Sequence, residues 1–275
     1  MIETSLPLSP QVFAILSALV EEQLGLQYRL EERDLLAERV SRRAVERGFE
    51  SLLDYYYFLR YDAAAKSEFP RLAEELVVNE TFFFREVAGL RLVAESFVPE
   101  LLASGVRPRI WCAACATGEE PLTLAMLLDG AGLLDRVEIV ASDINARALA
   151  HAAAGHYRRR SLRSLPPSVV GRWMVEHGDG MQVAPRLQEA ISWRRVNLLE
   201  TDREALGAAF DVVLCRNVFI YFSDKTISHV LSMFYDRMRP GGSLLVGAAE
   251  SLTRFDVGFR CEERAGAFFY RREAP

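Results

Sequence analysis

The hydrophobic pattern of the chain changes at residues 79–85, and this change constrains the fold more than any other feature. Before it, apolar residues recur at helical spacing, whereas after it short apolar runs alternate with helical stretches. Alternation of strand and helix predicts a parallel sheet with right-handed crossovers. The sequence therefore predicts a small all-α N-terminal domain over residues 1–78 and an α/β domain over residues 79–275.

Helix start and stop signals divide the N-terminal region. Ser9 before Pro10 is typical of a helix start, and Gly25 is expected to end that helix. Further helices are predicted at residues 31–47, 52–60, 63–78 and 86–103.

Short apolar runs in the rest of the chain predict strands. The main strands are expected at residues 109–113, 137–141, 210–215, 242–246, 259–263 and 267–271. Helices are expected between them at residues 119–128, 145–154 and 224–238. The last two strands lie so close together that an antiparallel hairpin is predicted.

A stretch with little helical pattern interrupts this alternation between residues 155 and 195. Short strands are predicted within it at residues 173–175, 181–183 and 191–193, with a turn at residues 178–180. We interpret the stretch as a small antiparallel β-subdomain inserted into the α/β domain. Such insertions often carry partner recognition.

Composition excludes several classes of protein. Half of the residues are apolar and the formal net charge is −5, so a sizeable core is possible and binding of nucleic acid through overall charge is disfavoured. Met1–Pro7 lacks the pattern of a secretory signal, and no apolar run approaches the roughly 20 residues that span a bilayer. We therefore expect a cytoplasmic protein with no membrane insertion and no nucleic-acid partner. We also expect a monomer.

Cys112 and Cys115 form a C-x-x-C motif. A structural zinc site would require two more ligands, and the sequence has no second pair. A redox pair is geometrically possible, because a strand precedes the motif and a helix follows it. Packing of small residues in a tight loop is the favoured interpretation, and no metal is expected.

Residues that follow the predicted strands are expected to form the ligand site, because open α/β sheets bind ligands beyond the carboxyl ends of their strands. The loop at residues 114–118 has neither the glycine fingerprint of dinucleotide-binding proteins nor the Walker lysine. Glu119 and Glu120 suit a cationic group better than a phosphate, although they also suit the helix dipole. Asp143 follows the second strand, where it could accept ribose hydroxyls or cap a helix.

A dense polar cluster follows the strand at residues 210–215. It contains Arg216, Asn217 and Tyr221 within an apolar run. A ligand with a ribose and a cationic portion, but without a pyrophosphate, points to S-adenosylmethionine.

The segment Asn79–Arg85 contains three consecutive phenylalanines, flanked by polar residues. Aromatic bulk with polar edges at a domain junction is typical of a ligand-site wall. A hydrophobic plug between two domains would use the same residues, so both interpretations stay open at this point.

Together these segments resemble the chemotaxis receptor methyltransferases, the CheR family. The matching segments occur in the order of the family, at residues 79–85, 111–121, 142–144, 197–199, 215–222 and 240–242. The resemblance implies a Rossmann-like class I methyltransferase domain with a seven-stranded mixed sheet. It also implies transfer of a methyl group from S-adenosylmethionine to glutamate side chains of a chemoreceptor's cytoplasmic helical bundle, which leaves S-adenosylhomocysteine and tunes chemosensory adaptation.

The resemblance also assigns roles to individual residues. The cofactor site would be lined by Asn79, Thr81, Arg85, Glu119, Asp143, Asn197, Leu198, Cys215 and Arg216. Arg85 and Tyr221 would lie near the transferred methyl group.

Two features bear on how a receptor would be recognised. The turn at His177–Gly180 is short for the hairpin with which the family docks a receptor's C-terminal pentapeptide, so we expect independence from such a tether. Arg39, Arg42 and Arg43 share a helix face that could dock acidic methylation helices, or that could be a solvated face balanced by neighbouring acids. The alternative functions are a methyltransferase for another substrate and a regulatory module that binds S-adenosylmethionine.

Overall fold

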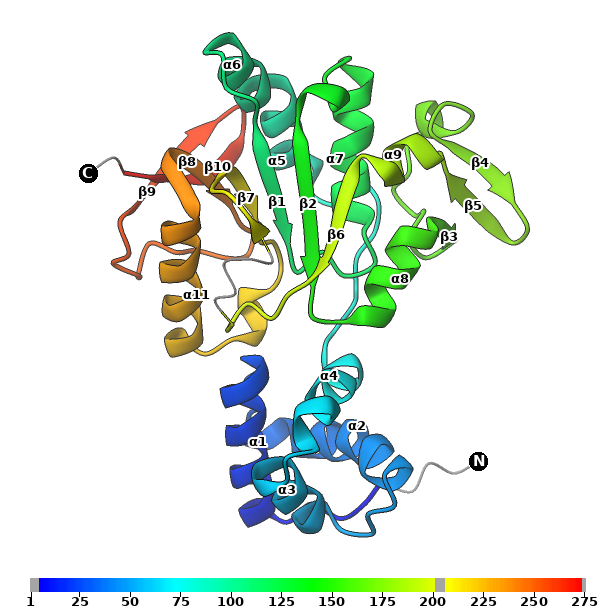
Figure 1. Ribbon diagram of the computed structural model, residues 1–275, viewed down its shortest axis with the longest axis vertical. Coiled ribbons are helices and arrows are strands. Elements are labelled where there is room, and N and C mark those ends of the chain that lie inside the picture. The colour runs from blue at the N-terminus through cyan, green and yellow to red at the C-terminus, as the bar shows by residue number, and fades with distance from the viewer. Residues whose placement is uncertain (1–4, 201–205, 274–275) are drawn as a thin grey trace.

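The computed structural model describes residues 5–200 and 206–273 of the chain. A group of four α-helices lies at one end of the molecule, and an α/β layer structure lies at the other (Figure 1). Met1–Thr4, part of the segment that argued against a secretory signal, lie outside the described residues.

The helical part confirms the expected helices with small shifts at their ends. It contains α1 (Pro10–Leu24), α2 (Arg33–Glu46), α3 (Leu52–Tyr61) and α4 (Ala65–Leu76), with a 3-10 turn, η1 (Leu30–Glu32). The Ser9 hydroxyl accepts a hydrogen bond from the Val12 amide, and Gly25 ends α1 in the left-handed conformation that favours glycine. The core of this part is apolar and includes Leu16, Val20, Leu36 and Leu72.

The helix predicted at residues 86–103 forms as α5 (Val87–Leu92), a π-helical turn η2 (Val93–Phe97) and α6 (Val98–Ala103). The Val98 amide donates to the Val93 carbonyl, five residues back, instead of four. Pro99 follows directly and has no amide hydrogen, so the widened turn occurs where the normal helical hydrogen-bond ladder is already interrupted.

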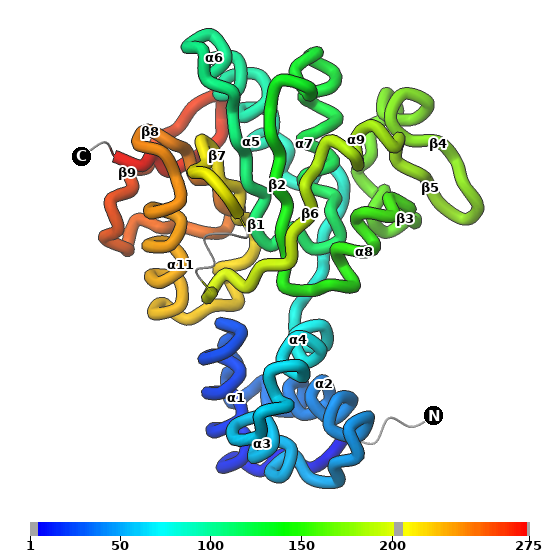
Figure 2. Tube along the Cα trace, in the orientation of Figure 1, coloured from blue at the N-terminus to red at the C-terminus, as the bar shows by residue number. Residues whose placement is uncertain are grey.

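A seven-stranded mixed sheet forms the centre of the α/β part, in the order β6-β2-β1-β7-β8-β10-β9. Its strands are β1 (Arg109–Ala113), β2 (Glu138–Asp143), β6 (Ile191–Arg195), β7 (Phe210–Leu214), β8 (Met238–Leu245), β9 (Phe259–Arg264) and β10 (Ala267–Arg272). Two of these pairings are antiparallel, those of β10 with β8 and with β9, and the other pairings are parallel. From β1 the chain continues to β2 on one side, and β7 lies on the other, as the trace in Figure 2 shows. The strand order therefore reverses beside β1.

The assignment of residues 191–193 to the inserted subdomain is wrong. Ile191–Arg195 forms β6, an edge strand of the main sheet, and pairs in parallel with β2 through the register Ile139 to Ile191. The separate antiparallel sheet contains β3 (His156–Arg158), β5 (Gly180–Val183) and β4 (Met174–His177). A short helix, α9 (Pro185–Glu189), leads from this sheet into β6.

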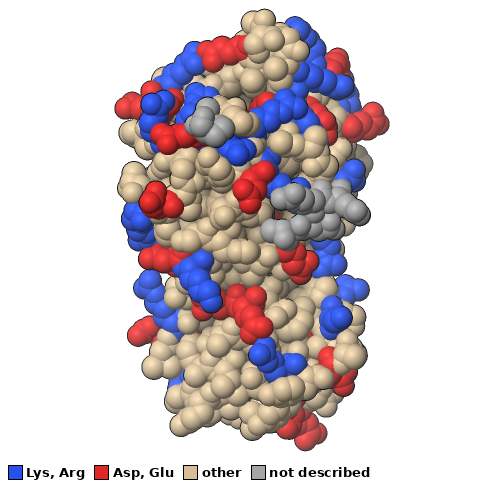
Figure 3. All heavy atoms as spheres, turned by 60° about the vertical axis from the view of Figure 1, so that its left-hand side comes forward, with Lys and Arg blue, Asp and Glu red and all other residues tan. Residues whose placement is uncertain are grey.

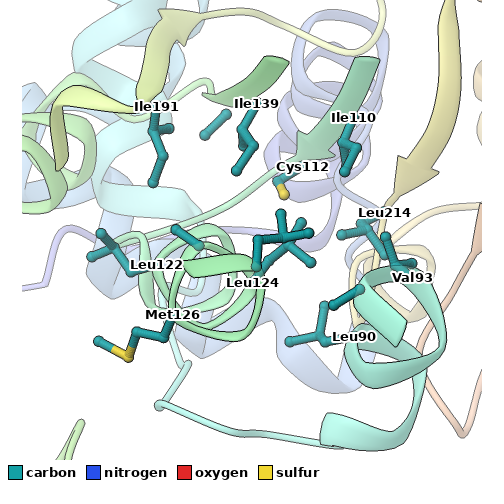
Figure 4. Close-up of a cluster of buried hydrophobic side chains, with 14 of the residues drawn as sticks. Leu90, Val93, Ile110, Cys112, Leu122, Leu124, Met126, Ile139, Ile191 and Leu214 are labelled. Carbon is teal, nitrogen blue, oxygen red and sulfur yellow. The ribbon is translucent and has the colours of Figure 1, made fainter. Parts of the chain in front are cut away.

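Helices cover the two faces of the main sheet and bury its apolar side chains. On one face, Ile110, Ile139 and Ile191 of the strands point towards Leu122 and Leu124 of α7 (Glu119–Gly130), and Figure 4 shows this packing. α8 (Ala146–Ala154) adds to the same cluster through its Leu149. α11 (Asp224–Arg237) covers the other face, where its Phe234 packs edge-on against Trp111 with ring centroids 5.1 Å apart.

The surface carries both signs of charge. On the face drawn in Figure 3, the described basic and acidic side chains are interspersed over both parts of the molecule. Among the helices that the structure describes, none is long and apolar enough to cross a membrane.

Candidate functional site

A cavity of about 1040 Å³, including its open mouth, lies between the helical part and the carboxyl ends of the central strands. It borders the point beside β1 where the strand order reverses, which is where open α/β sheets bind their ligands. Its walls are formed by short segments at residues 77–82, 114–116, 143–144, 196–198, 216–218 and 221–222. Single residues complete the lining, namely Leu24, Leu26, Arg85, Leu90, Glu120 and Thr123.

The segment Asn79–Arg85 has features of both a ligand-site wall and a hydrophobic plug. Asn79, Thr81 and Arg85, which were predicted to line the cofactor site, line this cavity. Phe83 is fully buried and packs edge-on against Tyr157, with ring centroids 4.8 Å apart. The segment is therefore both a cavity wall and a hydrophobic anchor.

Arg216 lines the cavity, but its guanidinium is held by protein groups. It donates to the Glu120 carboxylate at 2.8 Å and to the carbonyls of Arg85 and Glu86 at 3.0 and 2.9 Å. Only 5% of its side chain is exposed. Arg216 therefore fixes the backbone at Arg85. This structural role was not part of the prediction for Arg216, which assigned it to the cofactor site.

The Glu86 carboxylate completes this junction from the other side. It accepts hydrogen bonds from the Ala248 amide at 3.0 Å and from the Asn217 side chain at 3.3 Å, and it lies 3.3 Å from the Arg216 guanidinium. Burial alone would raise the pKa of Glu86, but the Ala248 amide and the Arg216 charge outweigh it, so the pKa is lowered. Glu86 is therefore held as a carboxylate.

Strained backbone gathers around the cavity. Five residues other than glycine adopt positive φ angles in the segments that form its walls or adjoin them, namely Phe84, Glu86, Ala114, Ala116 and Asn217. Such conformations cost energy and persist only where surrounding contacts impose them. The backbone conformation of these wall segments is therefore set by the surrounding contacts.

Asp143 lies at the end of β2, lines the cavity and is only 6% exposed. Its carboxylate accepts hydrogen bonds from the amides of Ala116 and Asn145, each at 2.8 Å. Burial raises its pKa, although these amides act in the opposite direction. Asp143 thus fixes the loop after β1 and also presents a carboxylate to the cavity.

Two residues predicted to line the cavity lie behind its walls. Glu119 is 1% exposed and accepts a hydrogen bond from the Thr117 hydroxyl at 2.7 Å. Cys215 is fully buried in the core under α11. Glu120, which the sequence analysis weighed but did not assign, lines the cavity together with Thr123, three residues further along the same helix face.

Asn197, Leu198 and Tyr221 line the side of the cavity that faces the helical part. The Asn197 side chain donates to the Gln23 carbonyl at 2.9 Å, near the end of α1. The Tyr221 carbonyl accepts a hydrogen bond from the Gln27 amide at 2.8 Å. The pKa of the Tyr221 hydroxyl is raised, because the effect of burial exceeds the opposing effect of the nearby Arg85 charge. The helical part is thus joined directly to two walls of the cavity.

The C-x-x-C motif packs as the favoured interpretation expected. Cys112 and Cys115 are buried, carry free thiols, and have pKa values that burial raises well above the ordinary value. Within residues 5–200 and 206–273, no group of three or more His, Cys, Asp or Glu residues is placed to hold a metal ion.

The three arginines proposed for docking differ in their surroundings. Arg43 forms two hydrogen bonds of 2.9 Å with Glu68, a buried carboxylate that also accepts from the Tyr55 hydroxyl. Arg39 donates to the Leu76 carbonyl at 2.6 Å, and Arg42 donates to Glu38 at 2.7 Å. Arg43 is therefore committed to the core of the helical part.

The reversed strand order, the antiparallel hairpin at one edge and the cavity at the carboxyl ends define a Rossmann-like class I methyltransferase. Residues 11–77 match the family model described as "CheR methyltransferase, all-alpha domain", and residues 79–267 match "CheR methyltransferase, SAM binding domain". The chain belongs to the CheR methyltransferase family.

Curated proteins from several bacteria are similar over nearly the whole chain. A chemotaxis protein methyltransferase of Vibrio parahaemolyticus is 34% identical over 259 residues, which cover 91% of this chain and 92% of that protein. Chemotaxis protein methyltransferase 1 of Pseudomonas aeruginosa is 29% identical and covers 94% and 97% of the two chains. A chemotaxis protein methyltransferase of Listeria innocua is 31% identical over 85% and 87%.

The cavity suits S-adenosylmethionine, the methyl donor of the family. The buried Asp143 carboxylate is placed to accept hydroxyl groups, and the apolar side chains of Ile144, Val196 and Leu198 lie beside it. Glu120 also lines the cavity, but its carboxylate is paired with the Arg216 guanidinium at 2.8 Å and burial raises its pKa, so it adds no free negative charge. The lining thus offers partners for a ribose and an aromatic base.

Proposed function

We propose that the enzyme methylates the γ-carboxyl of glutamate side chains on the cytoplasmic helical bundle of a chemoreceptor. The names of its relatives support a chemotaxis protein as the substrate. One observation carries the choice of a carboxylate: Arg85 and Tyr221 line the same cavity, and Arg85 donates to the Glu80 carbonyl at 2.9 Å. A guanidinium has five donor hydrogens, so donors remain to bind a carboxylate.

Methyl transfer to a glutamate carboxylate does not require a general base. S-adenosylmethionine supplies an electrophilic methyl group when it is bound. A glutamate side chain has a reference pKa of about 4.3, so it is already a nucleophile near neutral pH without a general base. Arg85 would hold the carboxylate through parallel hydrogen bonds, and the Tyr221 hydroxyl would orient it. Because the ester is neutral, it loses the ion pair with Arg85, which favours release of the product.

The donor would be held by the predicted residues that line the cavity. These are Asn79, Thr81, Arg85, Asp143, Asn197, Leu198 and Arg216. Glu119 and Cys215 would act behind the walls, and Glu120 joins the set as a lining residue. The boundary between an all-α domain and the methyltransferase domain would fall at residues 78–79.

Incubation with a methyl-labelled donor and a receptor's cytoplasmic fragment tests this proposal. We expect label on the fragment that is released by mild base, because carboxylate esters hydrolyse under those conditions. Label that resists base would indicate another acceptor group. Donor binding without transfer to any receptor fragment would favour a regulatory module instead.

We also propose that receptor methylation is independent of a pentapeptide tether. The turn between β4 and β5 contains only residues 178 and 179, and Asp179 at this turn forms an ion pair with Arg158 at 2.8 Å. A short turn held in this way offers little surface for a peptide. A saturable, tight complex with a receptor C-terminal pentapeptide in calorimetry would contradict this proposal.

The proposed setting follows from the proposed substrate. The enzyme would act in the cytoplasm, where the receptor bundle lies, as a monomer and without a nucleic-acid partner. Arg39 and Arg42 on α2 remain the proposed docking face for the acidic methylation helices. Arg43 would support that face from within.

A further inference from the structure

The inserted β-subdomain contacts two separate walls of the cavity through one side chain. Tyr157 of β3 is fully buried, and its hydroxyl donates to the Thr117 carbonyl at 2.6 Å. Thr117 belongs to the loop after β1, whose residues 114–116 line the cavity. The same Tyr157 ring packs edge-on against Phe83, in the segment Asn79–Arg85, with a centroid separation of 4.8 Å. Tyr157 therefore joins the two walls from behind.

The space around this contact is filled. A Cβ atom added at Gly118 would lie 2.6 Å from the Cβ of Ala152 and 3.2 Å from the Tyr157 hydroxyl, and Gly118 has a φ of +91°. Only glycine meets both requirements without displacing its neighbours. The loop after β1 is therefore packed closely against Tyr157, whose hydrogen bond to Thr117 adds to the one that Asp143 accepts from the Ala116 amide.

The turn that follows β3 contacts the segment Asn79–Arg85 at a second place. The guanidinium carbon of Arg163 lies 3.7 Å from the centroid of the Phe82 ring, and its Nη2 lies 3.3 Å from a Glu80 carboxylate oxygen. Arg160 also pairs with Glu80. The Phe83 amide donates to the Ser161 carbonyl at 3.0 Å, so the backbones are joined as well.

These contacts surround a residue assigned to the cofactor. Glu80 and Phe82 line the cavity on either side of Thr81, and Arg85 follows in the same segment. Tyr157 and Arg163 themselves do not line the cavity. Their influence on a bound donor would have to pass through the segment Asn79–Arg85 and the loop after β1.

We infer that Tyr157 and Arg163 are positioning residues for methyl transfer, and that the β-subdomain braces the donor cavity in addition to any role in partner recognition. The inference rests on the proposed function for its effect on turnover, but its effect on donor binding does not depend on the identity of the substrate. Small displacements of groups that orient reactants can reduce rates by about 100-fold.

Three variants of the full chain test the inference. Tyr157→Phe removes only the hydrogen bond to Thr117, Arg163→Gln removes the charge and planar fork over Phe82, and Arg159→Gln changes the charge of an exposed neighbour on the same turn as a control. Calorimetry would measure the affinity for S-adenosylhomocysteine, thermal unfolding would measure stability, and labelled transfer to a receptor fragment would give kcat and KM.

We expect the first two variants to lower the affinity for S-adenosylhomocysteine or the kcat by about tenfold, with KM for the receptor fragment and the unfolding midpoint little changed. Arg163→Lys should restore part of the loss, since it keeps the charge beside Glu80. Arg159→Gln should behave as the parent. Parent-like affinity and kcat in both Tyr157→Phe and Arg163→Gln would overturn the inference. A parent chain that binds S-adenosylhomocysteine but methylates no receptor would overturn only the proposed substrate, because the affinity comparison would still apply.

Discussion

The guanidinium of Arg216 donates to the backbone carbonyl of Arg85 at 3.0 Å, although the two residues are 131 positions apart in sequence. The residue expected to touch the transferred group is thus held in place by a side chain from a distant part of the sequence. Arg85 itself follows Phe84 and precedes Glu86, both with positive φ angles. The position of the Arg85 side chain therefore depends on tertiary contacts rather than on a regular helix or strand.

Replacing Arg216 with Met should destabilise the protein strongly. It would leave the Glu120 carboxylate, which is paired at 2.8 Å, without its cation in a buried place. Removing one partner of a buried pair costs about 3–5 kcal/mol. Urea unfolding would measure the loss, and the double variant Arg216→Met with Glu120→Gln should recover part of it. An Arg216→Met protein as stable as the parent would contradict this role.

Replacing Arg85 with Ala should reduce activity far more than stability. Its side chain is 28% exposed and donates to a backbone carbonyl, whereas the buried side chain of Phe83 carries the packing of the segment. Loss of a donor that orients or stabilises a reacting group typically costs about 100- to 1,000-fold in kcat. Paired measurements of kcat and of the urea midpoint would check this, with Phe83→Ala as the variant that should lose stability instead.

The stability of the protein should depend on Glu86 in a specific range of pH. The pKa of Glu86 is lowered in the folded state from an ordinary value of 4.5, so the unfolded chain takes up the proton first as the pH falls. The stabilisation is therefore fully present above pH 4.5 and is lost as the pH falls through the folded-state pKa. The stability advantage of the parent over Glu86→Gln should shrink over this range. An advantage that grows on acidification would contradict the contacts described for Glu86.

One thiol should react in the native protein. Of the four cysteines, Cys112, Cys115 and Cys215 are buried and Cys261 is exposed. Burial raises the pKa of the three buried thiols well above the ordinary value, which makes them poor nucleophiles. Titration with a thiol reagent should modify Cys261 rapidly and the others only on unfolding. Rapid native modification of Cys112 or Cys115 would reopen a redox interpretation of the motif.

Charge reversal on α2 should separate docking from folding. Arg43→Glu would place a carboxylate beside the buried Glu68 and should lower the unfolding midpoint. Arg42→Glu affects a side chain that is 39% exposed and pairs with Glu38 and Glu75, so it should lower stability only slightly and leave the donor affinity intact. If α2 docks the receptor, this second variant raises KM for the receptor fragment. Unchanged receptor methylation by Arg42→Glu would favour a solvated helix face.

Local signals predicted much of the fold. Ser9 and Gly25 begin and end α1 through contacts within a few residues, so the sequence carries the whole signal. The close pair of terminal strands forms the predicted hairpin for the same reason. By contrast, β6 is five residues long and its partner in β2 lies about fifty residues earlier, so nothing local shows which sheet it joins.

The site shows the same limit at the level of single side chains. Asp143 could be predicted because it follows a predicted strand, whereas Arg85 is assigned through the resemblance of residues 79–85 to the family. Glu119 and Glu120 are neighbours with the same side chain, and only the orientation of α7 against the cavity decides that Glu120 lines it. The clamp of Arg216 on Arg85 joins distant segments, and no spacing in the sequence encodes it.

Site-resolved mass spectrometry of a receptor fragment, after incubation with the enzyme and S-adenosylmethionine, would show directly whether the enzyme methylates receptor glutamates. We expect methyl esters on glutamate side chains of the cytoplasmic bundle, formed by the parent chain and nearly absent with Arg85→Ala. Methyl groups confined to other side chains, or equal methylation by both proteins, would contradict this expectation.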